Sequence, residues 1–207
     1  MTDLEFGEIL SLAYERRATE FKGPGPLSSP QLFAKVVRAV LGMANTQDGG
    51  LVVIGVEDKA GVLNPVGVAQ SDLRTWKHDD LTARIAAFAD PFVSFEQEIR
   101  THDGKQFLLL EIREFEEIPV LCRKGYRNNN QDILRSGACY VRTRRKPETS
   151  EIPSQTEMRE LLDLSLKKGL RKFMGQALAS GLVTAAAPVQ QPSDAERYAN
   201  QSRDLLT

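Results

Sequence analysis

The sequence predicts an α+β domain with a mixed β-sheet, in which a central buried strand and a β-hairpin are flanked by helices. Residues 51–56 form a continuous run of apolar, mostly branched side chains, which is typical of a strand buried on both faces. Residues 93–99 and 107–112 enclose an Asp103-Gly104 turn and predict the hairpin. Helical and extended patterns alternate without regular βαβ units, which favours an α+β domain over a doubly wound one.

The N-terminal elements follow in chain order. Residues 4–13 have near-helical apolar spacing and predict a short amphipathic helix. Residues 19–22 are expected to be extended, and the Gly-Pro-Gly-Pro run at 23–26 predicts a loop. Residues 30–45 predict a helix with Pro30 in its first turn and one apolar face.

The later elements are less regular. Residues 62–68 predict a short strand, and residues 71–88 predict a helix. Residues 118–121 and 138–142 predict strands on either side of a polar loop that has three asparagines at its tip. Ser154 and Glu157 have the spacing of a capping box, which opens a helix expected to reach Leu178.

Length and composition predict one globular domain over residues 1–180. The chain has 207 residues, of which 41% are hydrophobic and 27% charged. Residues 181–207 are rich in Ala, Pro and Gln and are expected to form a linker-like tail with a short helix at 195–206. The acidic N-terminus does not resemble a signal peptide, and no uncharged stretch is apolar enough to span a membrane. We therefore expect a cytoplasmic protein with no membrane contact.

Positive charge is concentrated in one part of the chain. Residues 121–146 contain eight cations and one acid, a net charge of +7, although the whole chain has a net charge of −1. This asymmetry indicates either a surface for a polyanion or a solvated face, and charge alone favours neither. The cations are Arg123, Lys124, Arg127, Arg135, Arg142, Arg144, Arg145 and Lys146.

Several chemistries find no motif in the sequence. There is no Walker A loop, no dinucleotide-binding glycine motif, no zinc-ligand spacing and no convincing Ser-His-Asp set. Carboxylates remain as candidates: Glu15 and Glu20 flank the end of the first helix, and Asp58 follows the central strand. Converging carboxylates could hold Mg²⁺ or Mn²⁺ for phosphodiester cleavage, with Lys22 orienting the phosphate. Ordinary surface carboxylates are the alternative, because a spacing of five residues is common in a chain with 28 acids.

Three blocks of sequence resemble the Schlafen AlbA-like domain, in the order found in that family. They are residues 15–22 (ERRATEFK), residues 44–58 (ANTQDGGLVVIGVED), and residues 139–142 (CYVR) with Thr149. The resemblance covers residues 15–162. It implies an α+β nucleic-acid-binding domain and, as in the Schlafen nucleases, a metal-dependent site for RNA cleavage. The family positions of its carboxylates fall on Glu15, Glu20 and Asp58.

From the residues and the resemblance together we expect a divalent-metal-dependent endoribonuclease that acts on structured RNA such as tRNA, with DNA as another possible substrate. Tyr140 and Arg142 alternate with Val141, so if Val141 faces the core, Tyr140 can stack on a base and Arg142 can pair with a phosphate. The alternative function is a non-catalytic DNA- or RNA-binding module of a transcriptional regulator or defence system. As partners we expect a homodimer, which would replace the second lobe of the two-lobed animal Schlafens, or a partner domain beyond the C-terminus. The cations expected to grip the backbone are Arg123, Lys124, Arg127, Arg142, Arg144, Arg145 and Lys146.

Overall fold

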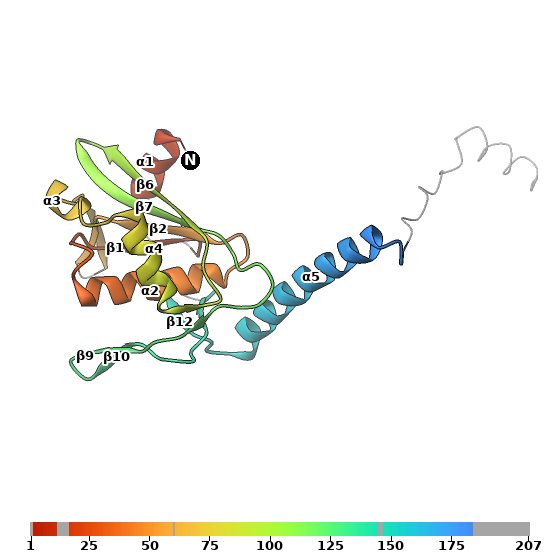
Figure 1. Ribbon diagram of the computed structural model, residues 1–207. Helices are drawn as coiled ribbons and strands as arrows, with labels where there is room; N and C mark the ends of the chain where they lie inside the picture. Colours follow the sequence, from red (N-terminus) through yellow and green to blue (C-terminus); the bar gives the residue numbers. More distant parts are fainter. Residues whose placement is uncertain (1, 12–16, 60, 145–146, 184–207) are drawn as a thin grey trace, which may run out of the picture. The chain divides into compact units, whose positions relative to one another are not determined.

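The computed structural model describes residues 2–11, 17–59, 61–144 and 147–183 (Figure 1). The chain divides into two compact units, residues 1–168 and residues 169–207. A four-stranded mixed sheet with the order β1-β2-β7-β6 lies at the centre of the first unit, and the predicted α+β class is confirmed. Strand β1 runs parallel to β2, whereas the β2-β7 and β7-β6 pairs are antiparallel. The four strands are β1 (Thr19–Lys22), β2 (Gly50–Ile54), β7 (Lys105–Ile112) and β6 (Phe95–His102).

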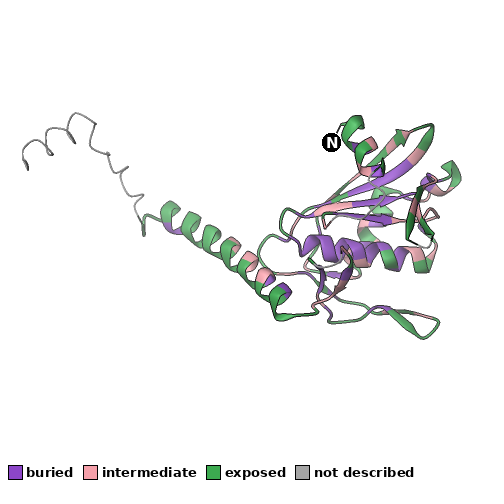
Figure 2. Ribbon diagram, turned by 180° about the vertical axis from the view of Figure 1, so that it is seen from behind, coloured by how far each residue is buried: buried purple, intermediate pink, exposed green. Residues whose placement is uncertain are grey.

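The sheet buries apolar side chains on both faces. On one face Val52 and Ile54 belong to the main core with helix α2 (Pro30–Ala44), which is buried along most of its length (Figure 2). On the other face Val53 belongs to a smaller core with Phe6 and Leu10 of helix α1 (Asp3–Ser11). Burial on both faces explains why β2 is apolar at successive positions instead of alternate ones.

Helix α2 begins and ends as the sequence predicts. The side chain of Ser29 accepts a hydrogen bond from the amide of Leu32, and Pro30 occupies the first turn. Asn45 caps the C-terminal end, and its side chain also joins distant segments. The Asn45 amide nitrogen donates to the carbonyls of Val120 (2.8 Å) and Tyr140 (2.9 Å), and its oxygen accepts from the amide of Val120 (2.8 Å).

The β6-β7 hairpin is also confirmed, with Asp103 and Gly104 at its turn in left-handed conformations (φ 50° and 72°). Gly49, at the turn before β2, has φ 71° as well. A side chain at Gly49 would collide with the carbonyl oxygen of Ile112, so this turn requires glycine for both its dihedral angle and its close approach to β7.

The strand predicted over residues 51–56 is shorter than expected. It ends at Ile54, because Gly55 adopts φ 119° and its carbonyl accepts hydrogen bonds from the amides of Val66 (3.0 Å) and Gly67 (2.9 Å). The chain then leaves the sheet and forms a separate antiparallel ribbon. Its strands are β3 (Val56–Lys59) and β4 (Val62–Pro65).

The single helix predicted over residues 71–88 is wrong, because the structure has two helices there. Helix α3 (Gln70–Leu73) and helix α4 (His78–Ala86) are separated by residues 74–77, which include Thr75 and Trp76. The Thr75 hydroxyl accepts from the amide of Leu27 (2.8 Å), and the Trp76 indole donates to the carbonyl of Gly25 (2.9 Å). These bonds to the loop before α2 stop the helix.

The segment after β7 contributes strands to three short antiparallel ribbons, one of which it completes with a strand that precedes β6. The expected polar loop contains a hairpin of its own, in which Asn129 and Asn130 adopt left-handed conformations at the tip. The ribbons pair β5 (Ala89–Asp90) with β8 (Leu121–Cys122), β9 (Tyr126–Asn128) with β10 (Gln131–Leu134), and β11 (Tyr140–Arg142) with β12 (Thr149–Glu151).

Helix α5 (Gln155–Ala179) follows β12 and begins at the predicted capping box, where the Ser154 hydroxyl bonds the carboxylate of Glu157. The predicted tail from residue 184 onward, with its short helix at 195–206, lies outside the described residues. Among the helices that the structure describes, none combines the length and apolarity needed to cross a bilayer.

Candidate functional site

Glu20 on β1 lies at the centre of a buried polar network. The residue is only 7% exposed, and its carboxylate uses both oxygens. Oε2 accepts hydrogen bonds from Nη1 of Arg142 (2.8 Å) and from the hydroxyl of Thr149 (2.6 Å), while Oε1 is bonded by the ammonium of Lys22. The network therefore joins β1 to both strands of the β11-β12 ribbon.

Arg142 is fully buried and donates in three directions. Besides bonding Glu20, its Nε donates to the carbonyl of Arg17 (3.0 Å) and its Nη2 donates to the carbonyl of Thr19 (3.1 Å). The expectation that Arg142 faces outward to grip a phosphate is wrong. A buried guanidinium requires an anion and carbonyl acceptors, and β1 with the turn before it supplies both.

Tyr140 is buried too, and the expectation that its ring faces outward to stack on a base is wrong. Its hydroxyl accepts a hydrogen bond from the amide of Arg135 (2.8 Å), and the guanidinium of Arg38 lies 5.4 Å from its ring centroid. Val141 is buried as well. Strand β11 thus has no exposed face. The expectation that Tyr140 and Arg142 face solvent because Val141 faces the core therefore fails.

The surroundings of Glu20 keep its carboxylate ionised. Burial by itself acts to raise its pKa, but the charges of Lys22 and Arg142 and the hydrogen bonds from Lys22 and Thr149 outweigh burial, so the pKa of Glu20 lies below its ordinary value. The carboxylate therefore serves as the counter-ion of two cations.

The three proposed metal ligands are not brought together in the part of the chain that the structure describes. Glu15 lies outside the described residues, and no group of three His, Cys, Asp or Glu side chains within them is placed to hold a metal ion. Asp58 is exposed on β3, where its carboxylate accepts from the amide of Gly61 (2.8 Å). Glu20 does not fit a Mg²⁺ or Mn²⁺ site in this arrangement, because both of its oxygens already bond protein donors.

The structure does bring Lys22 and Asp58 into one pocket. This pocket has a volume of about 500 Å³ and is lined by the end of β1, the first turns of α2 and strand β3. Lys35, Glu57 and Lys59 also line it. The two predicted residues therefore share a polar pocket of mixed charge, and Glu20 lies outside the lining.

Most of the predicted backbone-gripping cations that the structure describes are exposed. Arg123 and Lys124 follow β8, and Arg127 lies on the β9-β10 hairpin, where it pairs with Asp132 (2.7 Å). Arg144 is exposed and paired with Glu160, whereas Arg145 and Lys146 lie outside the described residues.

Arg135, which sequence reasoning counted in the charge but did not place in the site, is also exposed and pairs with Glu151. With Arg123, Lys124 and Arg127 it lies within or next to β9 and β10 in the chain, the strands of the hairpin that extends from the body of the first unit (Figure 1). We refer to these four cations as the basic hairpin. Arg135 could have been included from sequence, because it lies between two strands within the same basic segment.

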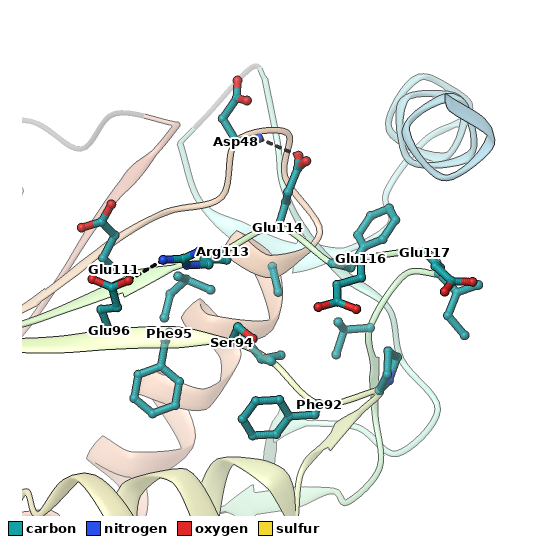
Figure 3. A pocket seen from close by; sticks show the side chains of 17 residues that line it. Asp48, Phe92, Ser94, Phe95, Glu96, Glu111, Arg113, Glu114, Glu116 and Glu117 are labelled. Atoms are coloured by element: carbon teal, nitrogen blue, oxygen red, sulfur yellow. Dashed lines mark hydrogen bonds and ion pairs between the residues drawn. The ribbon is translucent and has the colours of Figure 1, made fainter. Parts of the chain in front are cut away.

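A larger pocket has the opposite charge and lies between the ends of β6 and β7 and the segment that follows β7 (Figure 3). Its volume is about 1100 Å³, and we call it the acidic groove. Its lining contains six carboxylates and one guanidinium: Asp48, Glu96, Glu111, Glu114, Glu116, Glu117 and Arg113. This charge disfavours binding of a nucleic-acid backbone in the acidic groove.

Comparison with known proteins identifies one family. The family model described as Schlafen, AlbA_2 matches residues 15–150. A search of curated proteins finds no match.

Two solved structures are similar to this chain. The DIP2311 protein from Corynebacterium diphtheriae is 19% identical with a TM-score of 0.48, and the match covers 72% of this chain but only 30% of that protein. The N-terminal domain of a protein from Nitrosomonas europaea, described as related to the ATP-dependent DNA helicase RecG, is 23% identical with a TM-score of 0.39. That match covers 53% of this chain and 71% of the domain.

Proposed function

The chain belongs to the Schlafen AlbA_2 family, and we propose that it is a nucleic-acid-binding module that holds the phosphate backbone with its basic hairpin. The observation that carries the proposal is the exposure of Arg123, Lys124, Arg127 and Arg135 around one projecting hairpin. These cations lie in the segment that carries a net charge of +7, in a chain whose total charge is −1. Membership of this family supports a role connected with nucleic acid.

Exposed Arg and Lys side chains recognise phosphate without reading base sequence. Arg127 and Arg135 each exchange a surface carboxylate, Asp132 and Glu151, for phosphate when nucleic acid binds. Surface ion pairs of this kind contribute roughly 0–1 kcal/mol, so the exchange costs little. RNA is the favoured ligand, with DNA as the alternative.

Affinity measured against salt tests this proposal. We expect the affinity of the full chain for a labelled single-stranded RNA, a tRNA and a duplex DNA to fall steeply as salt rises, because binding to phosphates releases counter-ions. The double variant Arg123→Ala/Arg127→Ala should bind more weakly and should lower the slope of log K against log salt by about 0.7 for each phosphate of a single strand that it no longer neutralises. The matched control is Arg74→Ala, which removes an exposed arginine at the C-terminal end of helix α3. Unchanged binding and slope in the double variant would exclude the basic hairpin.

A metal-dependent endoribonuclease is the second candidate, favoured by the shared pocket of Lys22 and Asp58. In such an enzyme Lys22 would orient the phosphate, and Glu15 and Asp58 would supply carboxylates. Glu20 would have to give up Arg142 and Thr149 before it could bind an ion, so we assign it a structural role.

A cleavage assay separates the two functions. Labelled tRNA incubated with Mn²⁺, Mg²⁺ or EDTA should remain intact with the wild-type chain if the protein is a binding module. Metal-dependent cleavage that Asp58→Asn abolishes without loss of RNA binding would establish the endoribonuclease. Asp80→Asn, on an exposed face of α4, controls for removal of a surface charge.

A further inference from the structure

We propose that two copies of this chain associate reciprocally, the C-terminal segment of α5 from each copy docking in the acidic groove of the other. The segment comprises residues 169–183, which are the C-terminal part of α5 with the four residues that follow it and form the described part of the second unit. The association uses neither the basic hairpin nor the pocket of Lys22 and Asp58, so it stands independently of the proposed function.

The segment exposes many large apolar side chains for its length. Leu170, Phe173, Met174, Leu178 and Leu182 are all exposed, Phe173 at 61%. Ala177 is the one buried hydrophobic residue among those of the second unit that the structure describes. An apolar surface of this extent marks an interaction site.

All the charged side chains of the segment are positive. Arg171 and Lys172 are its cations, and residues 164–183 contain no acid. A fitting partner surface therefore combines apolar side chains with carboxylates. The same requirement disfavours direct pairing of two such segments side by side in parallel, because their cations would then adjoin.

The acidic groove meets both requirements. Its apolar residues include Phe92 and Ile118, which are 55% and 60% exposed. The exposed carboxylates of Glu111 and Glu116 also line the groove, Glu111 at the end where Glu96 and Arg113 lie (Figure 3). An amphipathic helix that lays apolar side chains in a groove and cations on its rim is a recurrent mode of recognition.

The chain's own Lys168 shows how a cation is accommodated at the groove. Its ammonium lies 2.6 Å from a carboxylate oxygen of Glu114 and 5.5 Å from the ring centroid of Phe115, and both residues line the groove. A lysine or arginine can thus pair with the rim while its alkyl stem covers an aromatic ring. Arg171 and Lys172 of the second copy offer the same chemistry.

A second copy of the chain supplies a complementary surface for both the segment and the acidic groove. Each chain has one segment and one groove, so a reciprocal pair buries two segments in two grooves and closes with twofold symmetry. The groove is negatively charged and the segment positively charged, so electrostatic attraction steers the two chains together. Salt screens this attraction, so we expect the dimer to weaken as the salt concentration rises.

Sedimentation equilibrium of the full chain tests the association. We expect wild-type protein to form a dimer of about 46 kDa, twice the 23.0 kDa chain mass. Phe173→Glu should raise the dimer dissociation constant at least about tenfold, because it places a charge at an apolar anchor. The charge reversals Arg171→Glu/Lys172→Glu and Glu111→Lys/Glu116→Lys should each weaken the dimer by a similar factor. Arg74→Glu should leave it unchanged.

Mixing the two charge-reversed variants distinguishes docking between copies from docking within one. An equimolar mixture pairs reversed segments with reversed grooves and native segments with native grooves, so we expect a heterodimer of nearly wild-type affinity. All the substituted side chains are exposed, and circular dichroism checks that each variant is folded. A monomeric wild type, a dimer insensitive to these changes, or a mixture that stays monomeric would overturn the proposal.

Discussion

Replacing Glu20 by alanine tests the buried network most directly. The substitution leaves the guanidinium of Arg142 fully buried without the carboxylate that bonds it at 2.8 Å. Removing one partner of a buried ion pair costs about 3–5 kcal/mol, because the remaining charge is uncompensated. We therefore expect Glu20→Ala to lower the free energy of unfolding by that amount. For a protein of this size the loss corresponds to roughly 6–20 °C in Tm.

A double-mutant cycle with Arg142→Met separates the pair from its surroundings. Arg142→Met should also be destabilising, because Glu20 and the carbonyls of Arg17 and Thr19 each lose the donor that the guanidinium supplies. The double variant Glu20→Ala/Arg142→Met should lose less than the sum of the two single losses, since it leaves no unpaired member of the pair.

Urea unfolding monitored by tryptophan fluorescence provides the measurement. Trp76 is the sole tryptophan of the chain and is buried, so its emission reports loss of the core. A loss below about 1 kcal/mol for Glu20→Ala would refute the structural role, because surface carboxylates contribute no more than this. An increase in the free energy of unfolding for Glu20→Ala would also refute it, because removal of a carboxylate stabilises a protein when that carboxylate lies among other negative charges.

Three further perturbations have outcomes set by local geometry. Because the pKa of Glu20 is lowered on folding, its stabilising contribution is complete above the ordinary pKa of 4.5 and is lost as the pH falls through the lower folded value. Urea midpoints between about pH 6 and about pH 3 should therefore fall more steeply for the wild type than for Glu20→Gln. Gly49→Ala should cost at least about 3 kcal/mol, because its methyl group meets the backbone of Ile112, whereas Gly61→Ala, with open space around it, should cost only about 1 kcal/mol for its positive φ. Thermal melts of the two variants compare these costs, and equal losses would refute the packing argument. Burial raises the pKa of Cys139 to about 11, so at pH 8 iodoacetamide should alkylate it at least about 100-fold more slowly in folded than in urea-unfolded protein, as followed by mass spectrometry.

Local sequence patterns determine the main secondary structure of this protein. The apolar face and proline start of α2, the Asp103-Gly104 turn of the hairpin and the capping box of α5 each act over a few residues, and the structure contains all three. The sequence blocks that resemble the Schlafen family likewise agree with the family match. Such features are readable because neighbouring residues are sufficient to produce them.

Other boundaries depend on interactions with remote parts of the chain. The helix expected over residues 71–88 is interrupted because Thr75 and Trp76 bond the loop that precedes α2. The strand expected over residues 51–56 stops where Gly55 turns the chain away from the sheet. In both cases hydrogen bonds to distant backbone groups override a continuous local pattern.

The roles of the charged residues were decided by tertiary structure in the same way. Glu20 and Arg142 are 122 residues apart, and their chemistry followed from the packing of the β11-β12 ribbon against β1 and α2. A strand with alternating Tyr, Val and Arg is equally compatible with one exposed face and with none. By itself the sequence determined which residue types were present, the elements that carry them and the basic character of residues 121–146. Only the fold decided which charges face solvent and which neutralise each other in the interior, because burial is a property of packing between distant segments.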